Sequence, residues 1–254
     1  MIYLPAAASA HAHQIDRVIF LTHLLMLLLF TGWGIYFVVA LFKFGRKRNP
    51  KASYEGVHSH ISSAVEIGVV IFEAVLLIGF SIPFWVQHVA ALPSGKEIVE
   101  VRITAEQFAW NIHYPGPDGI FGKTDLEFFD KQANPLGLDP ADPAGKDDVT
   151  TINQLHLPVG KTALITLTSR DVMHSFFLPV MRVKQDVIPG MRIPTWFTPI
   201  KTGQWEIACA QLCGLGHYRM RGFLTVHSQE EFEAWIAQQS APVSGGGSSD
   251  GFWQ

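Results

Sequence analysis

Cysteine is scarce in this chain, whose 254 residues include only two, Cys209 and Cys213. Two cysteines are too few for a disulfide-rich scaffold, which needs several pairs to replace a small core. Three residues separate them, so the C-x-x-C spacing of a thioredoxin-type site and the C-x-x-C-H sequence that attaches c-type haem are both absent. We therefore expect no covalently bound haem in this chain.

Charged side chains are also infrequent, at 16% of the residues against 48% apolar residues. Residues 18–42 include no Asp, Glu, Lys or Arg, and residues 64–92 include only Glu66 and Glu73. A helix needs roughly 20 residues to cross the hydrocarbon core of a bilayer, and both stretches are longer. The sequence therefore predicts two membrane spans.

Basic residues are concentrated in the loop between these two stretches. The loop holds five of them against one acidic residue, whereas the N-terminal tail has only Arg17. Because Lys and Arg mark the cytoplasmic side of a membrane, we expect this loop inside and both termini outside. The first residues lack the basic start and apolar stretch of a signal peptide, which leaves a cleaved leader as the less favoured alternative.

The rest of the chain has the pattern of an external all-β domain. Short alternating runs separated by Gly and Pro predict several strands in a sandwich or barrel, and "QEEFEAWIAQQ" has helical spacing. The predicted organisation is a tail at 1–16, a transmembrane hairpin at 17–92 with spans at about 17–42 and 64–91, an external domain at 93–240 and a flexible tail at 241–254.

Residues 115–150 form an insert rich in Pro, Gly and Asp. The segment is too long for an ordinary hairpin, which indicates either an excursion with a role or an unstructured loop. Its aspartates lack the oxygen spacing of a calcium-binding loop. From Lys96 onward the chain has 13 basic and 18 acidic residues, so this domain suits a basic partner better than a nucleic acid.

The segment "CAQLCGLGHYRM" at 209–220 places two thiols, His217 and Met220 within twelve residues. A disulfide is plausible outside the cytoplasm but leaves the histidine and methionine unexplained. A zinc site with an added histidine cannot use the thioether. Thiolate, imidazole and a weak methionine ligand are typical of electron-transfer copper, and His174 is a candidate second imidazole. Copper is the favoured interpretation, with zinc and a disulfide as alternatives.

The pattern C-x3-C-x3-H-x2-M, preceded by D-V-x-H-S, resembles the signature of subunit II of the haem–copper respiratory oxidases, of the copper-containing bacterial type. "DVMHSFFLPVMRVKQDVIPG" and "EQFAWNIHYP" are similar to two further segments of that family. The resemblance covers nearly the whole chain except 115–150 and the last dozen residues, and the two-span hairpin agrees with it.

The resemblance implies a mixed membrane and all-β architecture, in which the hairpin precedes a cupredoxin-like Greek-key β-barrel. It implies a binuclear copper centre, CuA, with haem confined to partner subunits. Carried over by position, the ligands are the side chains of His174, Cys209, Cys213, His217 and Met220 and the backbone carbonyl of Gln211.

The implied function is that of subunit II of a proton-pumping terminal oxidase in a bacterial inner membrane, with the copper domain on the periplasmic side. Electrons arrive from a c-type cytochrome or a membrane-bound c-haem subunit and pass to haem in subunit I. Oxygen is reduced to water there, so this chain contains no catalytic residue of its own. The alternatives are the copper subunit of a nitric-oxide or nitrous-oxide reductase and a membrane-tethered copper carrier.

Two positions depart from the family pattern. Gln211 replaces a glutamate that also binds magnesium in the family, and a neutral amide is a poorer ligand for a hard cation, which weakens the case for magnesium here. Phe108 replaces the tryptophan where electrons enter, while Trp110 matches the second aromatic position of that motif. The resemblance implies an altered docking face for the electron donor, or a phenylalanine that fills the same space.

The two carboxylates of the second span differ in their match to the family. An ionisable residue inside a span is a functional candidate by default. Glu66 is similar to a family glutamate at the entrance of a proton-uptake path in subunit I, and the bland alternative is an interfacial side chain that reaches water. Glu73 has no family counterpart, and we assign it no chemistry.

Overall fold

The computed structural model describes residues 4–51, 54–55, 59–89, 92–95 and 98–240. The predicted flexible tail at 241–254 lies outside the described residues. The chain divides into two compact units. One contains His13–Ala91, and the other contains Pro5–Ala12 together with the chain from Leu92 onward.

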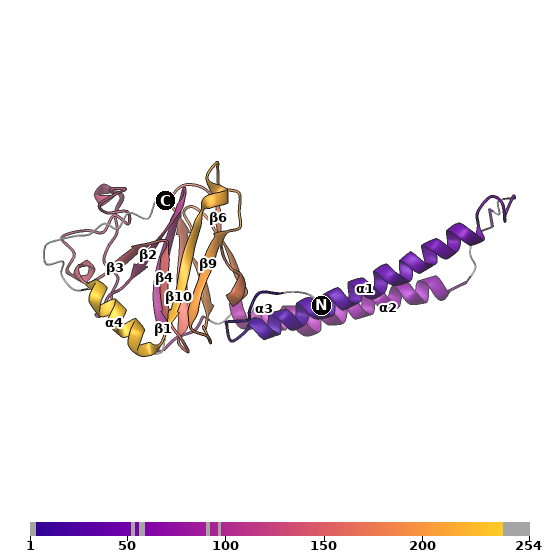
Figure 1. Cartoon of the computed structure of the whole chain (residues 1–254), viewed down its shortest axis with the longest axis horizontal. Helices are drawn as coiled ribbons and strands as arrows, with labels where there is room; N and C mark the ends of the chain where they lie inside the picture. Colours follow the sequence, from indigo (N-terminus) through magenta and orange to yellow (C-terminus); the bar gives the residue numbers. More distant parts are fainter. Residues whose placement is uncertain (1–3, 52–53, 56–58, 90–91, 96–97, 241–254) are drawn as a thin grey trace. The chain divides into compact units, whose positions relative to one another are not determined.

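The first unit is helical (Figure 1). Its elements are α1 (Ala12–Lys43), α2 (Ile61–Leu76), the π-helical turn η1 (Leu77–Ser81) and α3 (Ile82–Val89). Pro83 has no N–H to donate to the preceding turn, and the chain enters α3 through the wider π-turn just before it. Both Ala12–Lys43 and the continuous helical stretch Ile61–Gln87 are long and apolar enough to cross a membrane.

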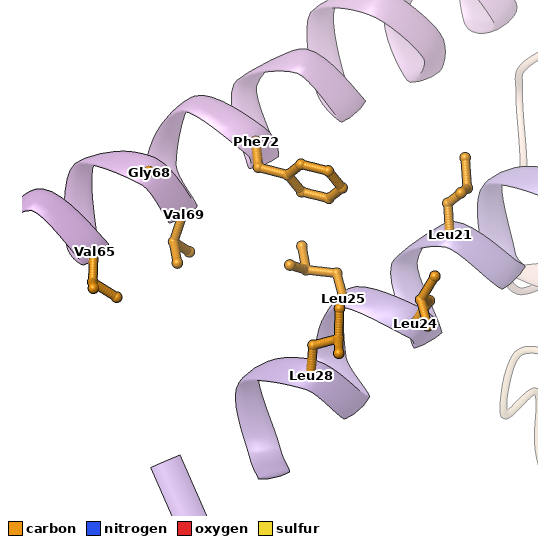
Figure 2. Close-up of a pocket in the computed structure, with 8 residues that line it drawn as sticks. All are labelled: Leu21, Leu24, Leu25, Leu28, Val65, Gly68, Val69 and Phe72. Atoms are coloured by element: carbon orange, nitrogen blue, oxygen red, sulfur yellow. The ribbon is translucent and has the colours of Figure 1, made fainter. Parts of the chain in front are cut away.

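Helices α1 and α2 face each other across apolar side chains (Figure 2). Leucines of α1 and the α2 residues Val65, Gly68, Val69 and Phe72 line a gap of about 310 Å³. A second gap of about 300 Å³ is lined partly by Glu73 and Ser81 of this unit. Most large apolar side chains on both helices are exposed, which suits lipid or another apolar surface far better than water.

The second unit contains two five-stranded sheets (Figure 1). The first has the order β3-β2-β1-β5-β8, and the second has the order β4-β10-β9-β6-β7. The strands are β1 (Ile98–Glu106), β2 (Ala109–Tyr114), β3 (Val149–Ile152), β4 (Gln154–Pro158), β5 (Thr162–Ser169), β6 (His174–Leu178), β7 (Val183–Val187), β8 (Ile193–Phe197), β9 (Gly203–Cys209) and β10 (Arg221–His227).

Alternating side chains build the core between the sheets. In β5 every second residue is buried, as the two-residue period of a strand predicts. Ile165 of β5 and Leu224 of β10 belong to one continuous cluster of buried residues that draws on both sheets. The expected all-β domain after two helices is confirmed. Strand β7 was not predicted, because its sequence "VKQDV" places polar residues at three successive positions.

The N-terminal segment before α1 packs on the β unit. The Ala8 amide donates to the Val180 carbonyl at 2.9 Å, and the Ile200 amide donates to the Ala8 carbonyl at 2.8 Å. The Ser9 hydroxyl donates to the Met181 carbonyl at 2.7 Å, and Ser9 is fully buried. Residues 5–12 therefore add a short bonded strap to this unit, although their composition has no strand pattern.

The insert predicted at 115–150 is folded by its own polar side chains. Asn134 donates to the carbonyls of Phe128 and Leu138 at 3.0 and 2.9 Å and accepts from the Leu138 amide at 2.9 Å. At its base, His113 Nε2 lies 2.5 Å from Asp148 Oδ2, and both side chains are buried. Short Asx-type turns of this kind have weak sequence patterns, so composition alone left the choice between an ordered and an unstructured insert open.

Helix α4 (Gln229–Ser240) contacts β3, β4 and β10. The Trp235 ring stacks on His156, with centroids 4.1 Å apart and planes 15° apart. His156 Nδ1 in turn lies 2.8 Å from His227 Nε2. Burial, followed by the neighbouring His227, lowers the pKa of His156 to about 4.

This lowered pKa predicts acid sensitivity of the β unit. An unfolded chain binds a proton at His156 near pH 6.5, whereas the folded chain resists it down to about pH 4, so stability falls as the pH drops through that window. His156→Phe keeps the ring on Trp235 and removes the titration. Urea unfolding of the full chain at pH 7 and pH 4.5 should show a smaller pH effect in the variant, and an equal loss in both proteins would contradict this account.

Candidate metal centre

The sulfur-rich loop joins two strands of the second sheet. His174 begins β6 and Cys209 ends β9, and these strands pair with Phe176 opposite Cys209. The Ala210 amide donates to the Ser175 carbonyl at 2.9 Å, and the Cys209 amide donates to the Met220 carbonyl at 3.3 Å. The chain of residues 210–220 is therefore fastened to the sheet at both ends.

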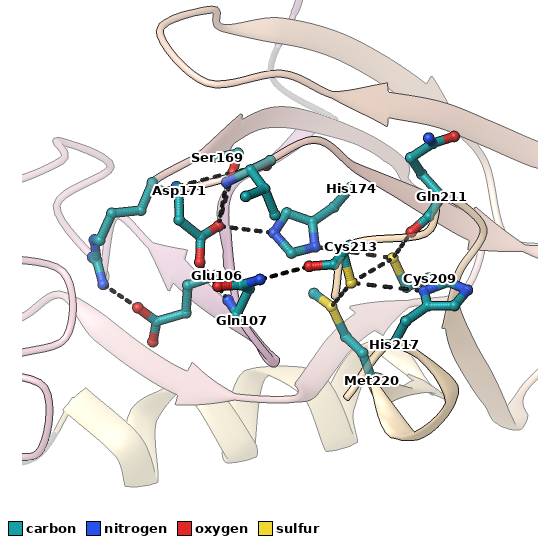
Figure 3. A network of polar contacts seen from close by, with 12 residues as sticks. Glu106, Gln107, Ser169, Asp171, His174, Cys209, Gln211, Cys213, His217 and Met220 are labelled. Atoms are coloured by element: carbon teal, nitrogen blue, oxygen red, sulfur yellow. Dashed lines mark hydrogen bonds and ion pairs between the residues drawn. The ribbon is translucent and has the colours of Figure 1, made fainter. Parts of the chain in front are cut away.

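Five side chains converge inside this loop (Figure 3). The two sulfur atoms of Cys209 and Cys213 lie 3.8 Å apart, and both cysteines are free thiols. Cys209 Sγ is 3.9 Å from His174 Nδ1, and Cys213 Sγ is 3.6 Å from His217 Nδ1. The Met220 sulfur lies 3.7 Å from Cys213 Sγ. Each thiol thus has its own imidazole, and the thioether lies beside only one of them.

Gln211 contributes its backbone to the same cluster. Its carbonyl oxygen lies 3.2 Å from Cys209 Sγ. Its side chain points away from the sulfur atoms, as Figure 3 shows, and the residue is exposed. Replacing a glutamate by glutamine at this position therefore leaves the carbonyl contact with Cys209 available.

The two thiols differ in their protonation. Burial opposes ionisation of Cys209, but contacts with His174, Gln211 and other hydrogen-bonding groups outweigh it and lower its pKa to about 6. Burial and the negative charge of Cys209 raise the pKa of Cys213 to about 12. Two adjacent thiolates repel each other, so ionising both needs a cation between or beside them.

A carboxylate fixes the ring of the buried His174. His174 Nε2 lies 2.9 Å from Asp171 Oδ1, and the Gln107 amide donates to Asp171 Oδ2 at 2.7 Å. The Gln107 side chain also donates to the Cys213 carbonyl at 2.6 Å. A carboxylate on the outer nitrogen holds Nδ1 toward the sulfur atoms, which is the usual support of a metal-binding histidine.

The aromatic candidates occupy different places in this site. Phe108 packs over the loop, where a Cβ added to Gly216 would lie 2.4 Å from its ring, so only glycine fits there. Trp110 is fully buried, with its ring centroid 6.2 Å from that of His174. Phe108 therefore packs against the loop, and Trp110 packs against His174 of β6.

This set of donors suits a soft metal. The candidate ligand atoms of His174, Cys209 and Cys213 all lie within 4.8 Å of one another. A closed zinc site could use the thiolates and imidazoles but would leave the Met220 thioether without a role. Thiolate, imidazole and thioether together favour copper.

The six residues that the family resemblance implies as ligands come together here, namely His174, Cys209, Gln211, Cys213, His217 and Met220. Glu66 lies on α2, in the helical unit. Sequence reasoning missed the part of Gln107, which touches both Asp171 and the loop. Its position directly before Phe108 was the available signal, but an exposed glutamine has no distinctive spacing.

Known proteins with similar sequences share one description. The chain is 34% identical over 226 residues to the alternative cytochrome c oxidase subunit 2 of Bradyrhizobium diazoefficiens, covering 89% of this chain and 80% of that protein. It is 30% identical to the cytochrome c oxidase subunit 2 of Cereibacter sphaeroides, covering 78% of this chain and 67% of that protein.

Among solved structures, the periplasmic domain of subunit II of cytochrome oxidase from Bradyrhizobium japonicum is 30% identical, covers 59% of this chain and 96% of its own, and has a TM-score of 0.43. The family profile described as "Cytochrome C oxidase subunit II, periplasmic domain" matches residues 99–226. That range contains both sheets and the whole sulfur-rich loop. The chain therefore belongs to the cytochrome c oxidase subunit II family.

Proposed function

We propose that this chain is the copper subunit of a proton-pumping terminal oxidase and that it binds the binuclear centre CuA. In this proposal it receives electrons from a c-type cytochrome and delivers them to haem in subunit I, where oxygen is reduced to water. The observation that carries the proposal is the pair of free thiols 3.8 Å apart, with an imidazole beside each. Family membership supplies the oxidase context.

His174, Cys209, Cys213, His217 and Met220 would hold the copper through side chains, and Gln211 through its carbonyl. Bound copper supplies a one-electron redox couple at this position. The protein holds the donors in place, because strands β6 and β9 and the amide contacts of Cys209 and Ala210 fix both ends of the loop. Donors that do not move on electron transfer keep the reorganisation of the site small.

Several observations support placing the β unit outside the cytoplasm. The family profile describes a periplasmic domain, and two helices of the chain are suited to cross a membrane. Residues 5–12 are bonded to the β unit, which supports placing this segment and the β unit on the same side of the membrane. Together with the basic loop between the spans, this favours two spans in a bacterial inner membrane with both termini on the periplasmic side.

The donor and acceptor partners would meet the exposed end of the loop. Leu212, Leu215 and Tyr218 are exposed there by 76%, 98% and 86%. In this proposal Phe108, over the loop glycines, lies where electrons enter, and buried Trp110 has a packing role behind His174. The acidic balance of the unit favours a basic donor. A tethered c-haem subunit is the alternative donor, because Phe108 replaces the family tryptophan at the entry position.

Magnesium is not part of the proposal. The family glutamate is replaced by Gln211, whose amide side chain is exposed and directed away from the sulfur atoms. A copper-carrier role is disfavoured by the burial of one thiol. Cys213 is only 4% exposed, whereas a carrier must present its thiols for exchange.

Replacing either cysteine tests the shared metal pair. Cys209→Ser or Cys213→Ser removes one of the two thiolates that would hold the copper pair, so the mixed-valence copper signal in electron paramagnetic resonance should be lost. A signal that persists unchanged in either variant would contradict the ligand assignment. The exposed variant Tyr218→Phe is the control, because it alters the same loop without touching a sulfur atom.

Met220→Leu tests the weak ligand. Leucine has similar volume and no sulfur, so copper should remain bound while its reduction potential shifts in a spectroelectrochemical titration. The matched control is Met191→Leu, because Met191 is 50% exposed in the β7–β8 loop. Loss of both copper atoms from Met220→Leu would show a stronger bond than this account assumes.

Glu66→Ala tests the proton-path assignment. If Glu66 admits protons to subunit I, oxygen consumption by the assembled oxidase should slow while reduction of the copper by the donor stays normal. Glu66→Asp retains the carboxylate and should recover part of the turnover. Unchanged turnover in Glu66→Ala would leave this residue with an interfacial role only.

A further inference from the structure

Arg170 lies directly before the carboxylate that orients His174, yet its own side chain faces the insert. It is in the turn after β5, and its amide donates to the Ala105 carbonyl at 3.0 Å. Its guanidinium carries three further contacts, all to groups outside that turn. None of them belongs to the family motif from which the copper ligands were derived.

The three contacts hold the guanidinium from different directions. Arg170 Nη1 donates to Glu106 Oε2 at 2.6 Å, in an ion pair whose side chains are 19% and 13% exposed. Arg170 Nη2 donates to the carbonyl of Pro135. The guanidinium carbon lies 4.1 Å from the centroid of the Phe129 ring. The planar, always charged guanidinium can donate to a carboxylate and a carbonyl while it stacks on a ring, which the ammonium group of a lysine cannot do.

Two of these partners, Phe129 and Pro135, belong to the insert, and hydrogen bonds within the insert hold them close together. The Asp130 and Asn134 amides and carbonyls pair with each other at 3.1 and 3.0 Å, closing a small loop between Phe129 and Pro135. The Asn134 side chain then bonds both flanks of that loop. The insert thereby presents one ring and one carbonyl to the same guanidinium.

The Arg170–Glu106 ion pair is also connected to the sulfur-rich loop. Glu106 precedes Gln107, which bonds both Asp171 and the Cys213 carbonyl. Arg170 precedes Asp171, which contacts His174. The Arg170–Glu106 pair therefore joins the segment that supports His174, through Asp171, to the segment that supports Cys213, through Gln107. Figure 3 shows Glu106, Gln107 and Asp171 beside the sulfur atoms.

We propose that the insert is a positioning element of the copper centre: Phe129 and Pro135 hold Arg170 against Glu106, and this clamp fixes Asp171 and Gln107 on the ligands. Arg170 is a positioning residue and touches no reacting atom. The inference rests on the proposed copper function. Its physical basis is that partners behind a metal ligand set the orientation of that ligand and the stability of the bound metal.

The test compares two phenylalanines of the insert that each lie under an arginine. Phe129 lies under Arg170, whereas Phe121 lies under Arg102, with 3.8 Å from the guanidinium carbon to the ring centroid, and faces the His113–Asp148 pair instead. Phe129→Leu and Phe121→Leu therefore remove equivalent stacking from one segment. Only the first should alter the copper centre of the purified full chain.

The measurements are the copper reduction potential, the visible and electron paramagnetic resonance spectra, and the rate of copper transfer to a chelator. Asp171→Asn serves as the reference, with faster transfer and a copper affinity lower by about tenfold, the smaller loss typical for partners of metal ligands. Phe129→Leu and Arg170→Lys should each shift the spectra and speed transfer by a smaller factor. Arg170→Gln should also lower the potential, because Glu106 loses its neutralising partner.

Three outcomes decide the matter. Shifted spectra and faster copper transfer in Phe129→Leu and Arg170→Lys, together with wild-type behaviour of Phe121→Leu, support the clamp. It is also supported if the double variant of Phe129→Leu and Arg170→Lys has a smaller effect than the sum of the two single variants. Equal effects of Phe129→Leu and Phe121→Leu, or lower thermal stability without a spectroscopic change, would overturn it. Failure of the wild-type chain to bind two copper atoms would instead overturn the proposed function.

Discussion

The close approach of two sulfur atoms, one part-buried and one buried, is the constraint on which the site depends. At 3.8 Å, the thiols of Cys209 and Cys213 can lose one proton readily but not two. The second ionisation needs positive charge at the same place, and the surrounding imidazoles and thioether favour a soft metal as its source. In the proposed function, the bound copper supplies that charge.

The β unit is organised to hold that arrangement. Two strands of one sheet carry His174 and Cys209, while Gln107, at the end of β1 in the other sheet, reaches across to Asp171 and the loop. Phe108 follows it and covers the loop glycines, whose lack of side chains leaves room for the ring. The proposed metal ligands are thus contacted from both sheets, and in our proposal the insert adds a third support through Arg170.

The sequence predicted the ligands better than the groups behind them. Cys, His and Met have few roles at such spacing, so the loop pattern and His174 sufficed to predict the cluster of donors that the structure brings together. The two long apolar stretches, the second with two glutamates, sufficed for both helices. The order of the insert, strand β7 and the contacts of Arg170 and Gln107 were not predicted. The insert is ordered by hydrogen bonds of common polar residues at irregular spacing, such as those of Asn134. Arg170 and Gln107 contact residues distant in sequence. Neither kind of contact has a readable sequence pattern, and three successive polar residues hide the strand period of β7.

Metal analysis of the purified full chain, combined with electron paramagnetic resonance, tests the central claim most directly. The account predicts two copper atoms per chain and, after partial reduction, one unpaired electron shared by both nuclei. A single zinc ion per chain, or a bond between the sulfur atoms of Cys209 and Cys213 with no metal present, would contradict it.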